Sequence, residues 1–128
     1  MFRAPSRDEL VSTLTDLSRP IAARMRAIFY LRSMADHREE NVAVLCQALR
    51  NESGTALFRH EIAYVLGQMQ EASAVPTLRA ILENVSDDVV VRHEVGCTSP
   101  LAPALFLFFN ALTSPTPSFL LPCSAQKL

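Results

Sequence analysis

Two stretches of the sequence, "ARMRAIFYLRSM" (Ala23–Met34) and "FRHEIAYVLGQM" (Phe58–Met69), align without gaps at an offset of 35 residues. Arginine falls on arginine, leucine on leucine and methionine on methionine. Within each stretch the apolar residues recur at the spacing that places them on one face of an α-helix. The sequence therefore predicts one amphipathic helix that occurs twice.

A second helix is predicted after each of these two. The stretch "NVAVLCQALRNES" (Asn41–Ser53) aligns with "AVPTLRAILENVS" (Ala74–Ser86) at an offset of 33 residues. Repeated pairs of helices with a fixed period stack into an α-solenoid. The W-x-x-L-G pattern of tetratricopeptide repeats and the TPLH motif of ankyrin repeats are both absent from the sequence. We therefore predict an all-α chain built from HEAT-like helical hairpins.

The predicted helices have recognisable starts and core faces. Ser6 and Glu9 match the S-x-x-E capping box, which starts a helix predicted to run to about Leu17. Pro20 is expected near the first turn of the next helix. Apolar spacing predicts four core faces, formed by Ile21, Met25 and Ile28 in the second helix, by Val42, Leu45, Cys46 and Leu49 in the third, by Ile62, Val65, Leu66 and Met69 in the fourth and by Val75, Leu78, Leu82 and Val85 in the fifth.

The composition changes sharply near Gly96. Of the 25 charged residues (12 basic and 13 acidic), only Lys127 lies in the last 34 residues, which also hold five of the eight prolines. A proline inside a helix costs roughly 3 kcal/mol, so the third repeat, which starts at about Asp87, is expected to break after Glu94. We predict two and a half HEAT-like repeats in residues 1–96 and an irregular, apolar, proline-rich tail, poorly ordered, in residues 97–128.

The net charge and the composition of the chain exclude some classes of partner. A formal net charge of −1 gives no basic surface for nucleic acid or for an anionic membrane. The apolar run in the tail is shorter than the roughly 20 residues needed to span a bilayer. The three cysteines have neither CxxC nor CxH spacing, which is typical of a reducing compartment. We therefore expect a cytoplasmic protein with no nucleic-acid or membrane partner.

An Arg-His-Glu motif occurs twice, at residues 59–61 and 92–94, in the same register of successive repeats. The first repeat has Met25 and Arg26 at the matching positions, so packing of a repeat does not require the motif. His60 and His93 are predicted to face away from the core, on helices roughly 8–10 Å apart. Two imidazoles and an adjacent carboxylate make a site typical of non-haem Fe(II). The alternative is that each His-Glu pair only decorates a solvated helix.

The stretch "RHEIAYVLGQMQEASAVPTL" (Arg59–Leu78), followed by "VVVRHE" (Val89–Glu94), resembles the N-terminal half of the deoxyhypusine hydroxylase family. The resemblance runs from about Pro20 to Gly96. It implies a HEAT-like oxidoreductase, a monooxygenase that uses iron and O2 to convert deoxyhypusine on a translation factor to hypusine. It also implies two similar halves, each with two His-Glu motifs, around a di-iron centre.

Carried over to this sequence, the resemblance implies that His60, His93 and Glu94 ligate one Fe(2+), and that Glu61 binds the cationic amine of the substrate. No third or fourth His-Glu pair occurs, so the chain is expected to hold half of the di-iron site and at most one iron. We therefore expect it to be inactive alone unless a homodimer pairs two half-sites. The alternatives are a non-catalytic HEAT-repeat module that binds protein, or an inactive truncated or splice product.

Overall fold

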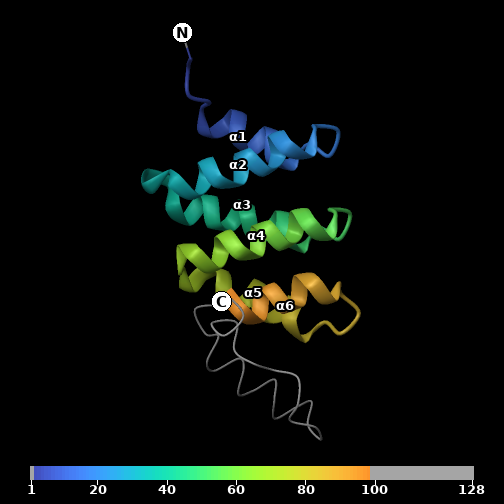
Figure 1. Ribbon diagram of the computed structural model, residues 1–128. Helices are drawn as coiled ribbons and strands as arrows, with labels where there is room; N and C mark the ends of the chain where they lie inside the picture. The colour runs from blue at the N-terminus through green and yellow to red at the C-terminus, as the bar shows by residue number, and fades with distance from the viewer. Residues whose placement is uncertain (1, 99–128) are drawn as a thin grey trace, which may run out of the picture.

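The computed structural model describes residues 2–98 of the chain (Figure 1). These residues contain α-helices, two short 3-10 turns at Ala35–His37 and Ala72–Ala74, and no strand. The all-α prediction is confirmed. The helices are α1 (Arg7–Thr15), α2 (Ile21–Ser33), α3 (Arg38–Arg50), α4 (Ala56–Met69), α5 (Val75–Glu83) and α6 (Val89–Thr98).

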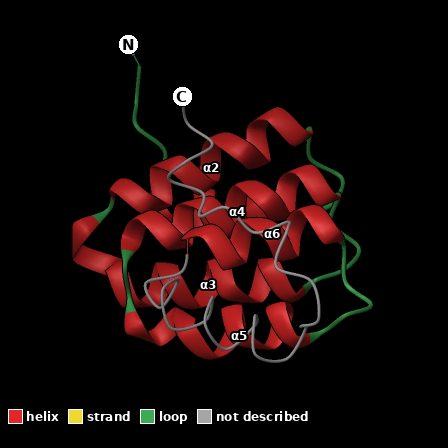
Figure 2. Cartoon of the chain, turned by 60° about the horizontal axis from the view of Figure 1, so that its bottom comes forward, coloured by secondary structure: helices red, strands yellow, loops and turns green. Residues whose placement is uncertain are grey.

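The helices stack in two layers, as expected of a HEAT-like solenoid. Helices α2, α4 and α6 form one layer, and α3 and α5 form the other (Figure 2). Each 3-10 turn joins the two helices of one repeat, so α2 with α3 and α4 with α5 are the predicted hairpins. Helix α4 packs against α2 on one side and against α6 on the other. The two His-Glu motifs therefore stand on neighbouring helices of one layer.

The core lies between the layers and runs through every repeat. Apolar residues at helical spacing face inward from each helix and are fully buried because they pack against the opposite layer. The predicted core face of α4 is confirmed. The largest fully buried side chains are those of Leu14, Ile28, Leu31, Leu45, Leu49, Phe58, Ile62, Leu66 and Leu78.

The helix ends differ from the sequence prediction at three places. The capping box is present, with Glu9 N donating to Ser6 Oγ and Ser6 N donating to Glu9 Oε2. Helix α1 ends at Thr15 rather than near Leu17, and α5 ends at Glu83, which leaves Val85 outside the helix and 79% exposed. Ile21 starts α2 but is exposed rather than in the core.

A repeated Asx turn explains why these helices end where they do. The side chains of Asp16, Asn51 and Asn84 each accept a hydrogen bond from the backbone N–H of the serine two residues later. Such a side-chain acceptor competes with continuation of the helix. The loops that follow, residues 16–20, 51–55 and 84–88, all have five residues. This shared loop is part of the repeat.

Helix α6 continues past the break predicted near Gly96. It runs through this glycine to Thr98, four residues beyond Glu94. A mid-helix glycine costs about 1 kcal/mol relative to alanine, and α6 buries Val91 and Val95 fully against the rest of the solenoid. The predicted tail from residue 99 onward lies outside the described residues, and the division at 96/97 stays a prediction.

No helix within residues 2–98 combines the length and the apolar character that crossing a bilayer requires.

Candidate metal centre

Helices α4 and α6 present the two His-Glu motifs in the same register. Thr55 caps α4, its hydroxyl accepting a hydrogen bond from Phe58 N. Asp88 acts in the same way before α6, its carboxylate accepting from Val90 N. Each histidine lies five residues after its capping residue. Local capping therefore brings the two motifs to equivalent heights on neighbouring helices.

His60 contacts the second motif through Glu94. The two atoms His60 Nε2 and Glu94 Oε2 lie 2.9 Å apart, and their side chains are 30% and 14% exposed. The other ring nitrogen, Nδ1, is buried and has no hydrogen-bond partner. Glu61 Oε1 lies 3.7 Å from it. His60 thus points from α4 toward α6, with Nε2 beside Glu94 and Nδ1 without a hydrogen-bond partner. We call this contact region of His60, Glu61 and Glu94 between α4 and α6 the groove.

His93 is exposed, and its ring lies beside Cys97 rather than beside His60. The sulfur of Cys97 is 3.8 Å from His93 Nδ1 and 3.9 Å from Nε2. Within residues 2–98 no group of three or more His, Cys, Asp or Glu side chains is arranged to hold a metal ion. The structure therefore brings His60 and Glu94 together and leaves His93 apart from them. The predicted ligand set stays a prediction.

The donor atoms nevertheless fit a metal such as iron in their chemistry. Imidazole nitrogen and carboxylate oxygen are the ligands of non-haem iron sites. A buried ring nitrogen without a partner is costly unless it meets a proton donor or a cation, and His60 Nδ1 is such an atom. An exposed side chain such as that of His93 changes rotamer within nanoseconds.

A close helix approach fixes the spacing of α4 and α6. A Cβ atom added to Gly67 would lie 2.3 Å from Thr98 Cβ and 2.6 Å from Thr98 O. The Thr98 hydroxyl lies within hydrogen-bond distance of two carbonyls, that of Glu94 in its own helix at 2.9 Å and that of Ala63 on α4 at 3.3 Å. Only glycine at position 67 permits this approach.

Replacing Gly67 with alanine is expected to destabilise the chain by about 1–3 kcal/mol, because α6 must move away from α4. Gly96→Ala is the matched control, since a Cβ there would meet Leu82 Cδ1 at an ordinary 3.7 Å. Removing this mid-helix glycine is expected to stabilise by up to about 1 kcal/mol. Urea unfolding of both variants gives the comparison, and equal effects would contradict the close approach.

Each repeat also contains an arginine that binds back to the preceding helix. The Nε–H groups of Arg24, Arg59 and Arg92 donate to the carbonyls of Leu14, Leu49 and Leu82, in each case ten residues earlier. A cation at these carbonyls also favours the negative end of the helix dipole. We call this contact the arginine brace. The alignment of Arg24 with Arg59 in the two repeats is the sequence pattern that could have predicted this brace.

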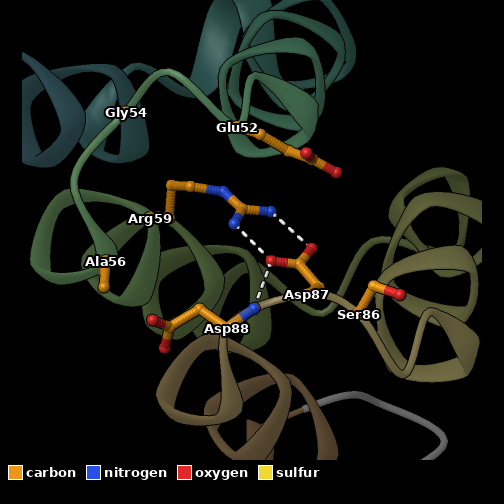
Figure 3. Close-up of a pocket in the computed structure, with 7 residues that line it drawn as sticks. All are labelled: Glu52, Gly54, Ala56, Arg59, Ser86, Asp87 and Asp88. Carbon is orange, nitrogen blue, oxygen red and sulfur yellow. Dashed lines mark hydrogen bonds and ion pairs between the residues drawn. The ribbon is translucent and has the colours of Figure 1, made fainter.

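Arg59 makes a second, buried contact that sequence reasoning missed. Its Nη1 and Nη2 lie 2.5 Å and 2.7 Å from the two carboxylate oxygens of Asp87, and both side chains are 4% exposed (Figure 3). The hydrogen bonds from Arg59 lower the pKa of Asp87. The pair borders a cavity of about 220 Å³ that none of the four His-Glu residues lines.

Comparison with known proteins agrees with this architecture. The family model for HEAT repeats matches residues 7–95. The chain therefore belongs to the HEAT-repeat family.

Within that family it is similar to deoxyhypusine hydroxylases. It is 42% identical to the Homo sapiens enzyme over 89 residues, which are 70% of this chain and 28% of the relative. It is 48% identical to the Xenopus laevis enzyme over 85 residues, 66% and 27% of the two chains. The solved structure of human deoxyhypusine hydroxylase in complex with glycerol matches with a TM-score of 0.67 at 34% identity, over 82% of this chain and 36% of that one. The resemblance expected from the sequence is confirmed, and the chain spans little more than a quarter of the length of these curated relatives.

Proposed function

We propose that this chain is a deoxyhypusine hydroxylase chain that contributes half of an iron centre. The proposed reaction is the hydroxylation of deoxyhypusine to hypusine on a translation factor, with Fe(2+) and O2. The observation that carries the proposal is the contact between His60 and Glu94, which joins two register-matched motifs in the groove. Similarity to enzymes named deoxyhypusine hydroxylase supports it.

His60, His93 and Glu94 would hold the iron, and the bound iron would supply the activation of O2. In the metal-free chain His60 Nε2 lies 2.9 Å from Glu94 Oε2, and the buried Nδ1 has no hydrogen-bond partner. Glu61 is in the same groove, with its carboxylate 27% exposed. A partly desolvated carboxylate binds an ammonium group more strongly than an exposed one does. We therefore assign to Glu61 the binding of the substrate amine.

A homodimer is part of the proposal, because the sequence has only two His-Glu pairs. Two copies with their α4–α6 grooves facing each other would supply the four pairs that the resemblance implies for a di-iron centre. We also infer a cytoplasmic location. A translation factor as the proposed substrate supports it.

The proposal is tested by native mass spectrometry of the full chain after anaerobic loading with Fe(2+). We expect a dimer that carries two irons. His60→Ala and His93→Ala are each expected to lower the affinity for iron by at least tenfold, because each removes one of only three protein ligands. The control is His37→Ala, since the third histidine pairs with Glu40 at an exposed turn away from the groove.

Three outcomes would contradict the proposal. Iron uptake that is equally reduced by His37→Ala would mean nonspecific binding. A wild-type chain that takes up no iron would favour a non-catalytic HEAT-repeat module. Hydroxylation of a deoxyhypusine-bearing protein by a chain that stays monomeric would contradict the homodimer alone.

A further inference from the structure

The two junctions between successive repeats are held in different ways. At the first junction, between α2 and α4, the guanidinium of Arg24 lies over the ring of Phe58, 4.1 Å from its centroid. At the second junction, between α4 and α6, Arg59 forms the bidentate ion pair with Asp87. Only the second junction carries His-Glu motifs on both of its helices. The ion pair and the candidate metal centre therefore lie at the same junction.

Arg59 connects three helices through one planar group. Its Nε–H donates to the carbonyl of Leu49 at the end of α3, 2.8 Å away. Its two Nη groups hold both oxygens of Asp87, just before α6. A bidentate guanidinium–carboxylate pair fixes an angle as well as a distance, whereas a ring contact defines neither so closely. Burial of both side chains excludes the water that would loosen the pair.

Asp87 also links this ion pair to the first turn of α6. One of its carboxylate oxygens also accepts the N–H of Asp88 at 2.7 Å. Asp88 in turn caps α6 through the N–H groups of Val90 and Val91. The helix is a rigid element, so its anchored start sets the position of Glu94 less than two turns later. On the other helix, His60 directly follows Arg59 in the chain.

We propose that Asp87 is a positioning residue for the candidate metal centre. By anchoring the start of α6 to Arg59, it sets the separation of the two His-Glu motifs and holds Glu94 at hydrogen-bond distance from His60. The inference rests on the proposed function for its role in iron binding. The placement of Glu94 against His60 is a property of the metal-free chain and is independent of that function.

Long-range 1H–15N spectra of the histidine side chains in the full, metal-free chain test the placement. In the wild type we expect one His60 tautomer, protonated at Nε2, because Glu94 holds that proton. Asp87→Asn removes the carboxylate charge at almost constant size. We expect it to give averaged tautomers and to weaken binding of the probe ion Co²⁺, read from its visible absorption, about 10–100-fold.

Two further variants separate positioning from a general loss of stability. Asp87→Glu keeps the charge and the ion pair but moves the carboxylate by one methylene, so we expect a folded chain that still shows averaged tautomers. Leu14→Ala removes a fully buried side chain from α1, far along the solenoid from the groove. We expect it to lower the urea concentration at the midpoint of unfolding, because it leaves a cavity in the core, with the His60 spectrum unchanged.

The inference is overturned if both Asp87 variants keep the wild-type tautomer and the wild-type affinity for Co²⁺. It is also overturned if Leu14→Ala changes the His60 spectrum as much as they do. If the wild type binds no Co²⁺, the proposed function fails, and the tautomer comparison alone decides whether Asp87 positions Glu94.

Discussion

Arg59→Met is expected to destabilise the chain by about 3–5 kcal/mol, because it leaves the carboxylate of Asp87 buried without its counter-ion. It also removes the arginine brace to Leu49 at the same time. Methionine keeps most of the volume of the side chain, so the lost charge dominates the effect. Urea unfolding followed by circular dichroism measures the change in the free energy of unfolding.

The double variant Arg59→Met/Asp87→Leu is the control. Replacing both charges by apolar side chains of similar size removes the desolvation penalty along with the attraction, and such replacements are often neutral. We expect it to recover most of the stability lost by Arg59→Met. A double variant as unstable as the single one would mean that packing, rather than the unpaired charge, causes the loss.

The same pair predicts how stability depends on pH. Hydrogen bonds from Arg59 hold the pKa of Asp87 below its ordinary value in the folded chain. The stabilisation is therefore fully present above the ordinary carboxyl pKa, and it is lost as the pH falls toward and through the lowered pKa of the folded state. We expect the free energy of unfolding of the wild type to fall relative to that of the double variant below about pH 4. A difference between the two that stays constant down to pH 2 would contradict the role of Asp87.

Phe58→Ala is expected to cost about 3–5 kcal/mol, the usual range for a fully buried phenylalanine. The side chain is 1% exposed and supports the guanidinium of Arg24 as well as the core between the layers. Phe58→Leu, which fills most of the space without a π face, separates the two contributions. We expect it to lose clearly less than Phe58→Ala.

A double-mutant cycle with Arg24→Met isolates the cation–π contact at this junction. We expect a coupling energy between Arg24 and Phe58 of about 0.5–2 kcal/mol. Urea unfolding of the wild type, both single variants and the double variant supplies the four values. A coupling near zero would show that Phe58 stabilises the junction by volume alone.

The repeat and its helices were predictable because they are written as periodic patterns within the chain. The self-alignment located both hairpins, and the apolar spacing located the buried faces of α3 and α4. The prediction was wrong at Val85 because the spacing continues beyond the end of α5. The Asn84 side chain ends the helix there by accepting the N–H of Ser86. Periodicity carries no information about such a competing hydrogen bond.

The contacts of the candidate metal centre were less predictable. The matching positions of the two motifs within their repeats predicted that they lie on neighbouring helices. The contact of His60 with Glu94 agrees with that prediction. The His93 ring lies beside Cys97 because of the rotamer that its side chain adopts. A rotamer depends on the neighbouring side chains, which a sequence pattern does not describe. Asp87 was not recognised because two successive aspartates before a helix usually cap it in water. Its partner, Arg59, was visible only as a repeated arginine.

The arginine braces also determine where this protein can change in length. Each brace joins an arginine early in a helix to a carbonyl ten residues earlier, across a loop of five residues. An insertion in residues 51–55 would separate Arg59 from the carbonyl of Leu49 and shift the phase of α4. The 3-10 turn at Ala35–His37, on the opposite edge, is crossed by another contact of the same span, in which the buried Asn41 donates its Nδ2–H to the carbonyl of Leu31. New loops, whether acquired in evolution or grafted by design, are therefore disfavoured both in the five-residue loops and at this turn.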